Sequence, residues 1–98
     1  MFDMNNEMFK KMQEAVELSK NKLETLSVVG EAAGGLVRIE LNGNRKLKSL
    51  EINASLKDIE KEDLEDFISI ALDRALEQAN EINEKEMSNS ATSFLPKF

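Results

Sequence analysis

The chain has 98 residues, the size of one small domain, and its 41% hydrophobic and 33% charged residues are typical of a globular protein rather than a disordered one. It contains no cysteine and no histidine, so disulfides, thiolate chemistry and the commonest general base and metal ligand are excluded. The formal net charge of −6 repels polyanions at long range, so any contact with nucleic acid has to be local.

These exclusions lead to expectations about function and location. We expect no enzyme activity, no cofactor, no metal and no small-molecule substrate. The sequence from Met1 shows neither the basic start nor the apolar stretch of a signal peptide, and no apolar run approaches the ~18 residues that span a bilayer. We therefore expect a cytoplasmic protein without a membrane partner.

The first predicted element is an amphipathic helix over residues 3–23. Its apolar side chains recur at helical spacing, at Met8, Met12, Ala15, Val16 and Leu23. Four of the first twelve residues are methionine, which indicates either a soft, adaptable binding surface or ordinary core packing. This helix would be about 30 Å long and a strand of eight residues only ~26 Å, so we expect one end of the helix to extend past the sheet.

Lysines line the borders of this helix's apolar stripe. Lys11 and Lys22 share one border because eleven residues make about three turns, and Lys20 lies on the other border. One interpretation is structural: the lysine stems cover apolar surface and pair with glutamates one turn away, as Lys10 would with Glu14. The other is a row of phosphate contacts.

The middle of the chain predicts a three-stranded antiparallel meander. Val37, Ile39 and Leu41 alternate with more polar neighbours, which is the period of a strand with one apolar face. Gly34-Gly35 supplies the positive φ angles of a tight turn, and Asn42-Gly43 is the strongest short hairpin signal. The expected strands cover residues 26–33, 36–41 and 45–53. So small a sheet needs an apolar cover, which we expect from the flanking helices.

A second amphipathic helix is predicted after a strand break at residues 53–55. Asp58 is the expected N-cap, and Glu60, Glu62 and Asp63 follow at the positive end of the helix dipole. We do not interpret the acidic cluster of Glu62, Asp63, Glu65 and Asp66 as a metal site, because it lacks the ligand spacing and the glycine of a calcium loop.

The body of this helix carries a ridge of small residues, Ala71, Ala75 and Ala79, that permits close approach to the sheet or to another helix. Arg74 and Lys85 are again eleven residues apart and share a border of the apolar stripe. They are a second pair of cations placed like Lys11 and Lys22.

We predict that the second helix ends at Met87. The domain then covers residues 1–87, and residues 88–98, SNSATSFLPKF, form a flexible C-terminal tail that Pro96 interrupts.

The sequence GEAAGGLVRIELNG at residues 30–43, followed by KLKSLEIN at residues 46–53, resembles the YbaB/EbfC family of small bacterial nucleoid-associated proteins. The likeness covers nearly the whole chain, including the Met-rich opening helix and the long second helix with its alanines. The chain departs from the family pattern at Asn53-Ala54, where members often carry Asp-Pro, and at Ile59, where a second proline is common.

The resemblance implies an α+β fold of order α-β-β-β-α, in which two long amphipathic helices cover the three-stranded antiparallel meander. It also implies a homodimer that projects helices like the arms of tweezers and binds double-stranded DNA with little sequence preference. Such a protein is located at the nucleoid in the cytoplasm and affects nucleoid organisation or gene expression. The matching arm cations are Lys10, Lys11, Lys20, Lys22, Arg74 and Lys85. A second candidate patch comprises Arg38, Arg45, Lys46 and Lys48.

Two other interpretations stay open at this point. The protein could be an adaptor that docks its Met-rich helix on a protein partner, with nucleic-acid binding incidental. RNA could replace DNA, since phosphate contacts carry no base information. Single strands are not expected, because the five phenylalanines, without tyrosine or tryptophan, make a poor base-stacking platform.

Overall fold

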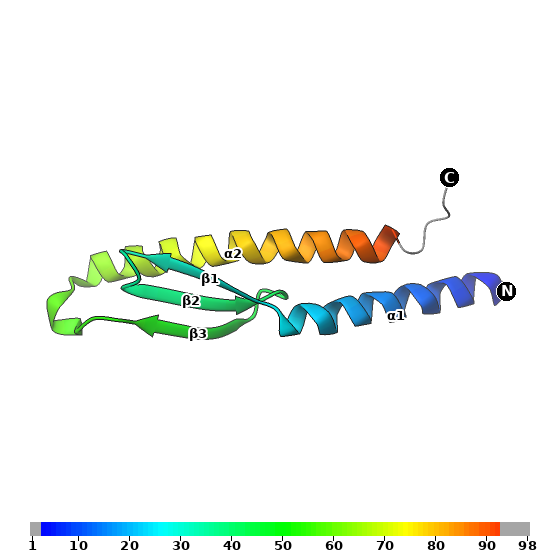
Figure 1. Ribbon diagram of the computed structural model, residues 1–98, viewed down its shortest axis with the longest axis horizontal. Coiled ribbons are helices and arrows are strands. Elements are labelled where there is room, and N and C mark those ends of the chain that lie inside the picture. The colour runs from blue at the N-terminus through cyan, green and yellow to red at the C-terminus, as the bar shows by residue number, and fades with distance from the viewer. Residues whose placement is uncertain (1–2, 93–98) are drawn as a thin grey trace.

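The computed structural model describes residues 3–92, with side chains from residue 7 to residue 90. The elements follow the predicted order α-β-β-β-α (Figure 1). They are α1 (Asp3–Thr25), β1 (Ser27–Ala32), β2 (Val37–Asn42), β3 (Leu47–Ile52), the short 3₁₀ helix η1 (Leu56–Asp58) and α2 (Lys61–Thr92).

The three strands form one antiparallel sheet in the order β1-β2-β3, as predicted. The register places Gly30 opposite Ile39 and Ile39 opposite Leu50, and a bulge follows Glu40. The apolar side chains of β2 are almost fully buried, as the period-two pattern predicts. The core therefore lies on one face of the central strand.

α2 covers this face of the sheet through its ridge of alanines. Ala71, Ala75 and Ala79 are fully buried against β1 and β2. A Cβ atom on Gly30 would lie 2.1 Å from the backbone oxygen of Ala71 and 2.4 Å from the backbone nitrogen of Ala75, so only glycine fits in β1 at this point. The predicted close approach of the alanine ridge is confirmed.

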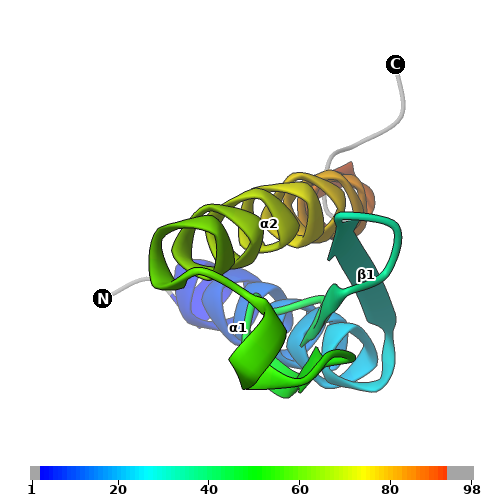
Figure 2. The ribbon, with the colours of Figure 1, turned by 90° about the vertical axis from the view of Figure 1, so that its left-hand side faces the viewer.

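α1 takes a different position from the one expected, because it adds little to the cover of the sheet. α1 and the sheet lie end to end along the same side of α2, with α1 antiparallel to the second half of that helix (Figures 1 and 2). Leu23, near the end of α1, is fully buried, but Met8 and Phe9 are each 59% exposed. The predicted extension of a helix past the sheet is confirmed, and it involves most of α1.

This end-to-end arrangement makes the molecule elongated. It measures 65 × 24 × 19 Å with a radius of gyration of 19.0 Å, whereas a compact chain of this length has about 13 Å. The half of the molecule beyond the sheet consists of two helices side by side, which we call the arm: α1 and the second half of α2.

The two turns of the sheet differ in how far they follow the expectation. Gly34 and Gly35 have φ angles of +66° and +91°, as predicted for the first turn. In the second, the left-handed residue is Arg45, with φ +67°, and not Gly43. Gly43 serves another purpose: its N–H donates to the backbone oxygen of Leu23 at 2.8 Å, and a Cβ atom there would lie 2.7 Å from that oxygen.

α2 begins and ends at different residues from those predicted. Asp58 is not the N-cap, because it ends η1; α2 begins at Lys61, and the N–H of Leu64 donates to the backbone oxygen of Glu60. α2 ends at Thr92 rather than Met87, so residues 88–92 are helical. Pro96 and the phenylalanines of the tail lie outside the described residues, and the division into a domain and a flexible tail stays a prediction.

Candidate nucleic-acid interface

The six predicted arm cations are all exposed, and most of them carry no ion pair. α1 carries Lys10, Lys11, Lys20 and Lys22, and α2 carries Arg74 and Lys85. Among the side chains of residues 7–90, no carboxylate lies within 4.0 Å of Lys10, Lys11, Lys20 or Lys85. The expected pair of Lys10 with Glu14 is therefore not formed, and these charges are open to an outside ligand.

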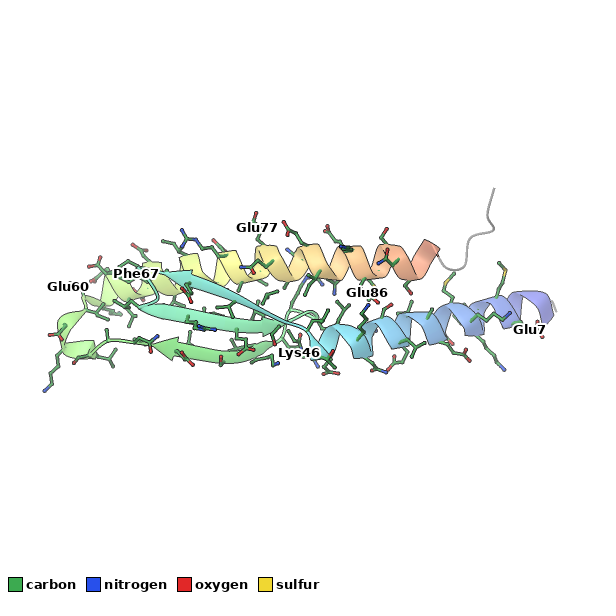
Figure 3. The ribbon with its side chains drawn as sticks, in the orientation of Figure 1. Glu7, Lys46, Glu60, Phe67, Glu77 and Glu86 are labelled. Atoms are coloured by element: carbon green, nitrogen blue, oxygen red, sulfur yellow. The ribbon has the colours of Figure 1, made fainter. Side chains whose placement is uncertain are left out.

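Lys22 is the arm lysine with an acidic partner. Its Nζ lies 3.3 Å from Oε2 of Glu86, so the pair connects α1 to α2. Glu86 is labelled on α2 in Figure 3. An exposed pair of this kind contributes at most about 1 kcal/mol to folding, but it neutralises the charge that Lys22 would offer to a phosphate.

Arg74 is held at the edge of the sheet. Its Nη1 donates to the backbone oxygen of Glu31 at 2.7 Å, and Gln78 Nε2 donates to the backbone oxygen of Val29 at 2.7 Å. Both side chains thereby satisfy outward carbonyls of the edge strand β1. Lys85 lies about 16 Å further along α2, so the six cations do not form one cluster.

The second predicted patch divides into two parts. Arg38 and Lys48 lie on the sheet and are paired, Arg38 with Glu31 at 3.5 Å and Lys48 with Glu40 at 3.8 Å. In this respect they resemble Lys22 and differ from the unpaired arm lysines, which are Lys10, Lys11, Lys20 and Lys85 among the described side chains.

Arg45 and Lys46 instead lie beside the arm, in the hairpin that joins β2 to β3. With Lys20 they line a groove of about 480 Å³ between α1, the hairpin and α2. The lining also includes two acids and three amides, namely Glu17, Glu24, Asn21, Asn44 and Asn83. We call this the hairpin groove. Sequence reasoning assigned its cations to separate patches because no local pattern reveals that the hairpin docks on α1.

Two side-chain contacts and a backbone contact hold the walls of the hairpin groove together. Asn44 Nδ2 donates to the backbone oxygen of Lys20 at 2.9 Å, and Asn83 Nδ2 donates to that of Gly43 at 3.0 Å. The N–H of Gly43 donates to Leu23 on α1. The groove is therefore built by contacts among three elements.

Other kinds of site find little support in the described part of the chain. Across residues 7–90, acidic side chains do not gather in a group of three or more that could hold a metal ion. Glu62 and Asp63 occupy the first turn of α2, where the helix dipole favours them. Neither described helix is long and apolar enough to cross a bilayer.

Comparisons with known proteins agree on the family. The model of the YbaB/EbfC DNA-binding family matches residues 1–94. The chain is 36% identical over 87 residues to a nucleoid-associated protein of Flavobacterium johnsoniae, covering 89% of this chain and 81% of the relative. It is 39% identical over 79 residues to a nucleoid-associated protein of Hahella chejuensis, covering 81% and 73%.

A solved structure shares the fold. The crystal structure of an uncharacterized protein from Helicobacter pylori superposes with a TM-score of 0.81 at 22% identity, covering 94% of this chain and 97% of that one. At this identity the likeness shows the fold alone. On the family model and the relatives together, the chain belongs to the YbaB/EbfC family of nucleoid-associated DNA-binding proteins.

Proposed function

We propose that the protein binds double-stranded DNA as a homodimer through contacts to the phosphate backbone, with low sequence specificity, and so affects nucleoid organisation or gene expression in the cytoplasm. The observation that carries this proposal is the set of exposed arm lysines without acidic partners among the described residues, in a chain that belongs to a DNA-binding family. Nothing in the proposed function requires catalysis.

Phosphate contacts by lysine explain both the affinity and the low specificity. A lysine ammonium is a compact point charge that attracts a phosphate without reading a base edge. From Lys10 to Lys20, α1 rises about 15 Å, which equals the axial length of about four phosphates of one strand at 3.4 Å each. Lys11 and Lys20 lie on opposite borders of α1, so the lysines of one arm contact phosphates at separate points of the duplex.

The acidic total restricts how this binding can work. A dimer carries twice −6, or −12, so its overall field opposes DNA. Only cations within about a Debye length of the phosphates, ~8 to 10 Å, can outweigh it. We therefore propose binding that is weak and strongly dependent on salt.

The homodimer is supported by apolar side chains that one chain leaves uncovered. Leu47 and Leu50 of β3 lie on the same sheet face as Leu41 and Ile39, but α2 packs on β1 and β2, so Leu47 is 63% and Leu50 47% exposed. Uncovered apolar surface of this kind marks an interface. A second copy bears the same surface and can cover it.

A duplex titration with matched variants tests the proposal. Lys10→Ala/Lys11→Ala removes four candidate contacts per dimer, and we expect affinity to fall more than tenfold and the slope of log K against log salt to fall by about 3 to 4. Lys57→Ala/Lys61→Ala is the control, because it removes the same charge at η1 and the start of α2. Equal affinity of the two variants would refute the assignment to the arm.

An adaptor function is the second candidate, favoured by the exposure of Met8, Phe9 and Met12 on α1. Methionine surfaces adapt to varied partners. Affinity capture after nuclease treatment separates the two functions, since a partner bridged by DNA is lost and a direct protein partner is retained. A competing RNA duplex of equal length measures the preference for DNA.

A further inference from the structure

We infer that the hairpin groove is a phosphate-binding site, in which the guanidinium of Arg45 holds one phosphodiester of the duplex bound by the arm. This inference rests on the proposed function and adds to it a contact at the hairpin, beyond those of the arm lysines. The ligand of this site is a phosphodiester group, which carries one negative charge.

The backbone of Arg45 is the first observation. Its φ of +67° lies in the left-handed region that glycine and asparagine adopt most readily. Gly43 and Asn44, in the same hairpin, do not adopt it. The hairpin, closed by the hydrogen bond from the N–H of Arg45 to the backbone oxygen of Asn42, thus holds arginine where glycine or asparagine would be less strained. The first turn holds Ala33 in the same region, with φ +54°, so the backbone fixes where the arginine lies, and its role is argued from its side chain.

The orientation of the guanidinium is the second observation. Nε of Arg45 donates to Oδ1 of Asn80 on α2, and no other side-chain hydrogen bond or ion pair of Arg45 is formed within the described residues. One contact at Nε fixes the plane of the group and leaves four N–H donors free. A planar fork held in this way suits two parallel hydrogen bonds to phosphate oxygens.

The neighbouring charges are the third observation. Lys20 and Lys46 line the same groove, together with Glu17 and Glu24. The lining charge is therefore +1, although the chain as a whole carries −6. Lys46 Nζ lies 4.0 Å from Oε1 of Glu24 and both side chains are largely exposed, so a phosphate can replace this weak partner.

The groove adjoins α1 at Lys20, which lies on the opposite border of the apolar stripe from Lys11. A duplex strand that contacts Lys20 therefore also reaches Arg45 and Lys46 in the same groove. This continuity favours a phosphodiester of the duplex over a free phosphate or nucleotide as the ligand.

Arg45→Gly is the central test, because glycine accepts the left-handed backbone and removes only the side chain. We expect its melting temperature to equal or exceed that of the wild type, its affinity for a labelled duplex to fall about tenfold, and its salt slope to fall by about 2, for two contacts per dimer. Arg45→Asn is a second variant with the same expectation. Asn80→Ala keeps every cation but frees the guanidinium, and should weaken binding about threefold.

Lys57→Ala is the matched control, since it removes one exposed cation at η1, outside both candidate patches. Its affinity and salt slope should equal those of the wild type. The inference is overturned if Arg45→Gly and Arg45→Asn bind the duplex as the wild type does while Lys10→Ala/Lys11→Ala binds weakly, and in that case the proposed function stands. If the wild type does not bind the duplex at low salt, both fail.

Inorganic phosphate distinguishes the source of the ligand. Added at constant ionic strength, it should displace little duplex, because a single phosphate lacks the arm contacts. Saturable binding of inorganic phosphate that Arg45→Gly abolishes, with duplex affinity unchanged, would overturn the assignment to the duplex.

Discussion

Gly30 sets how closely α2 can approach the sheet. Its position in β1 faces the backbone of Ala71 and Ala75, and the space for a Cβ atom does not exist there. Gly34 differs, because a Cβ atom added to it would meet nothing within 4 Å and only its φ of +66° favours glycine. The same residue type thus serves packing at one place and backbone conformation at the other.

Gly30→Ala should therefore destabilise the fold strongly. We expect a loss of about 3 kcal/mol or more in the free energy of unfolding, since the methyl group would meet helix backbone that cannot move aside. Gly34→Ala is the control, with an expected loss of about 1 kcal/mol from the left-handed φ alone. Urea unfolding measures both, and equal losses would contradict the packing argument.

The ion pair between α1 and α2 affects both the stability of the fold and the positive charge of the arm. Glu86 is the partner of Lys22, and their pair lies where the two arm helices meet. If the pair mainly holds the two arm helices together, its removal should weaken DNA binding. If the pair mainly neutralises Lys22, its removal should strengthen DNA binding.

Glu86→Gln separates these two effects. We expect a loss of less than about 1 kcal/mol in unfolding free energy, because the pair is partly exposed, and a gain of about two- to fivefold in duplex affinity from the freed lysine. Glu77→Gln makes the same charge change on α2 without breaking an ion pair among the described residues, and its gain should be smaller. Weaker DNA binding by Glu86→Gln would show that the pair positions the arm.

At the scale of elements, the sequence predicted what local patterns determine. The alternation around Ile39 and the alanine spacing of α2 identified the strand and the covering ridge correctly. The role of Gly43 and the left-handed Arg45 could not be foreseen, because both depend on the docking of the hairpin against Leu23. The N-cap was misplaced because η1, a turn without a periodic signal, precedes α2.

The candidate site was predictable only in part, for the same reason. Helical periodicity places Lys10 and Lys11 on the surface of α1, where the structure has them. Periodicity does not reveal that Glu86 neutralises Lys22 or that Arg74 is held by a carbonyl of β1. These outcomes depend on which helices and strands contact each other. The hydrophobic pattern within one helix or strand does not show which other element it contacts.

The shape of the whole molecule bears on its assembly. An elongated chain with an uncovered β3 and an exposed apolar half of α1 buries less surface than a compact domain of its length. A second copy would supply the missing cover.

Light scattering tests this assembly. We expect a mass of twice 11.1 kDa, or about 22 kDa, for the wild type, and a shift toward the monomer for Leu47→Ser/Leu50→Ser. Met8→Ser/Met12→Ser makes comparable changes on the arm, and it should leave the dimer intact if β3 forms the interface. A monomeric wild type at micromolar concentration would remove the homodimer from the proposal.

The measurement that tests the central claim most directly is a titration of duplex DNA against the wild-type protein over a salt series. If six to ten phosphates are engaged per dimer, log K should fall linearly with log salt, and affinity should drop by roughly 10³ to 10⁵ between 50 and 200 mM. Absence of binding at 50 mM salt, or an affinity that salt does not change, would contradict the account.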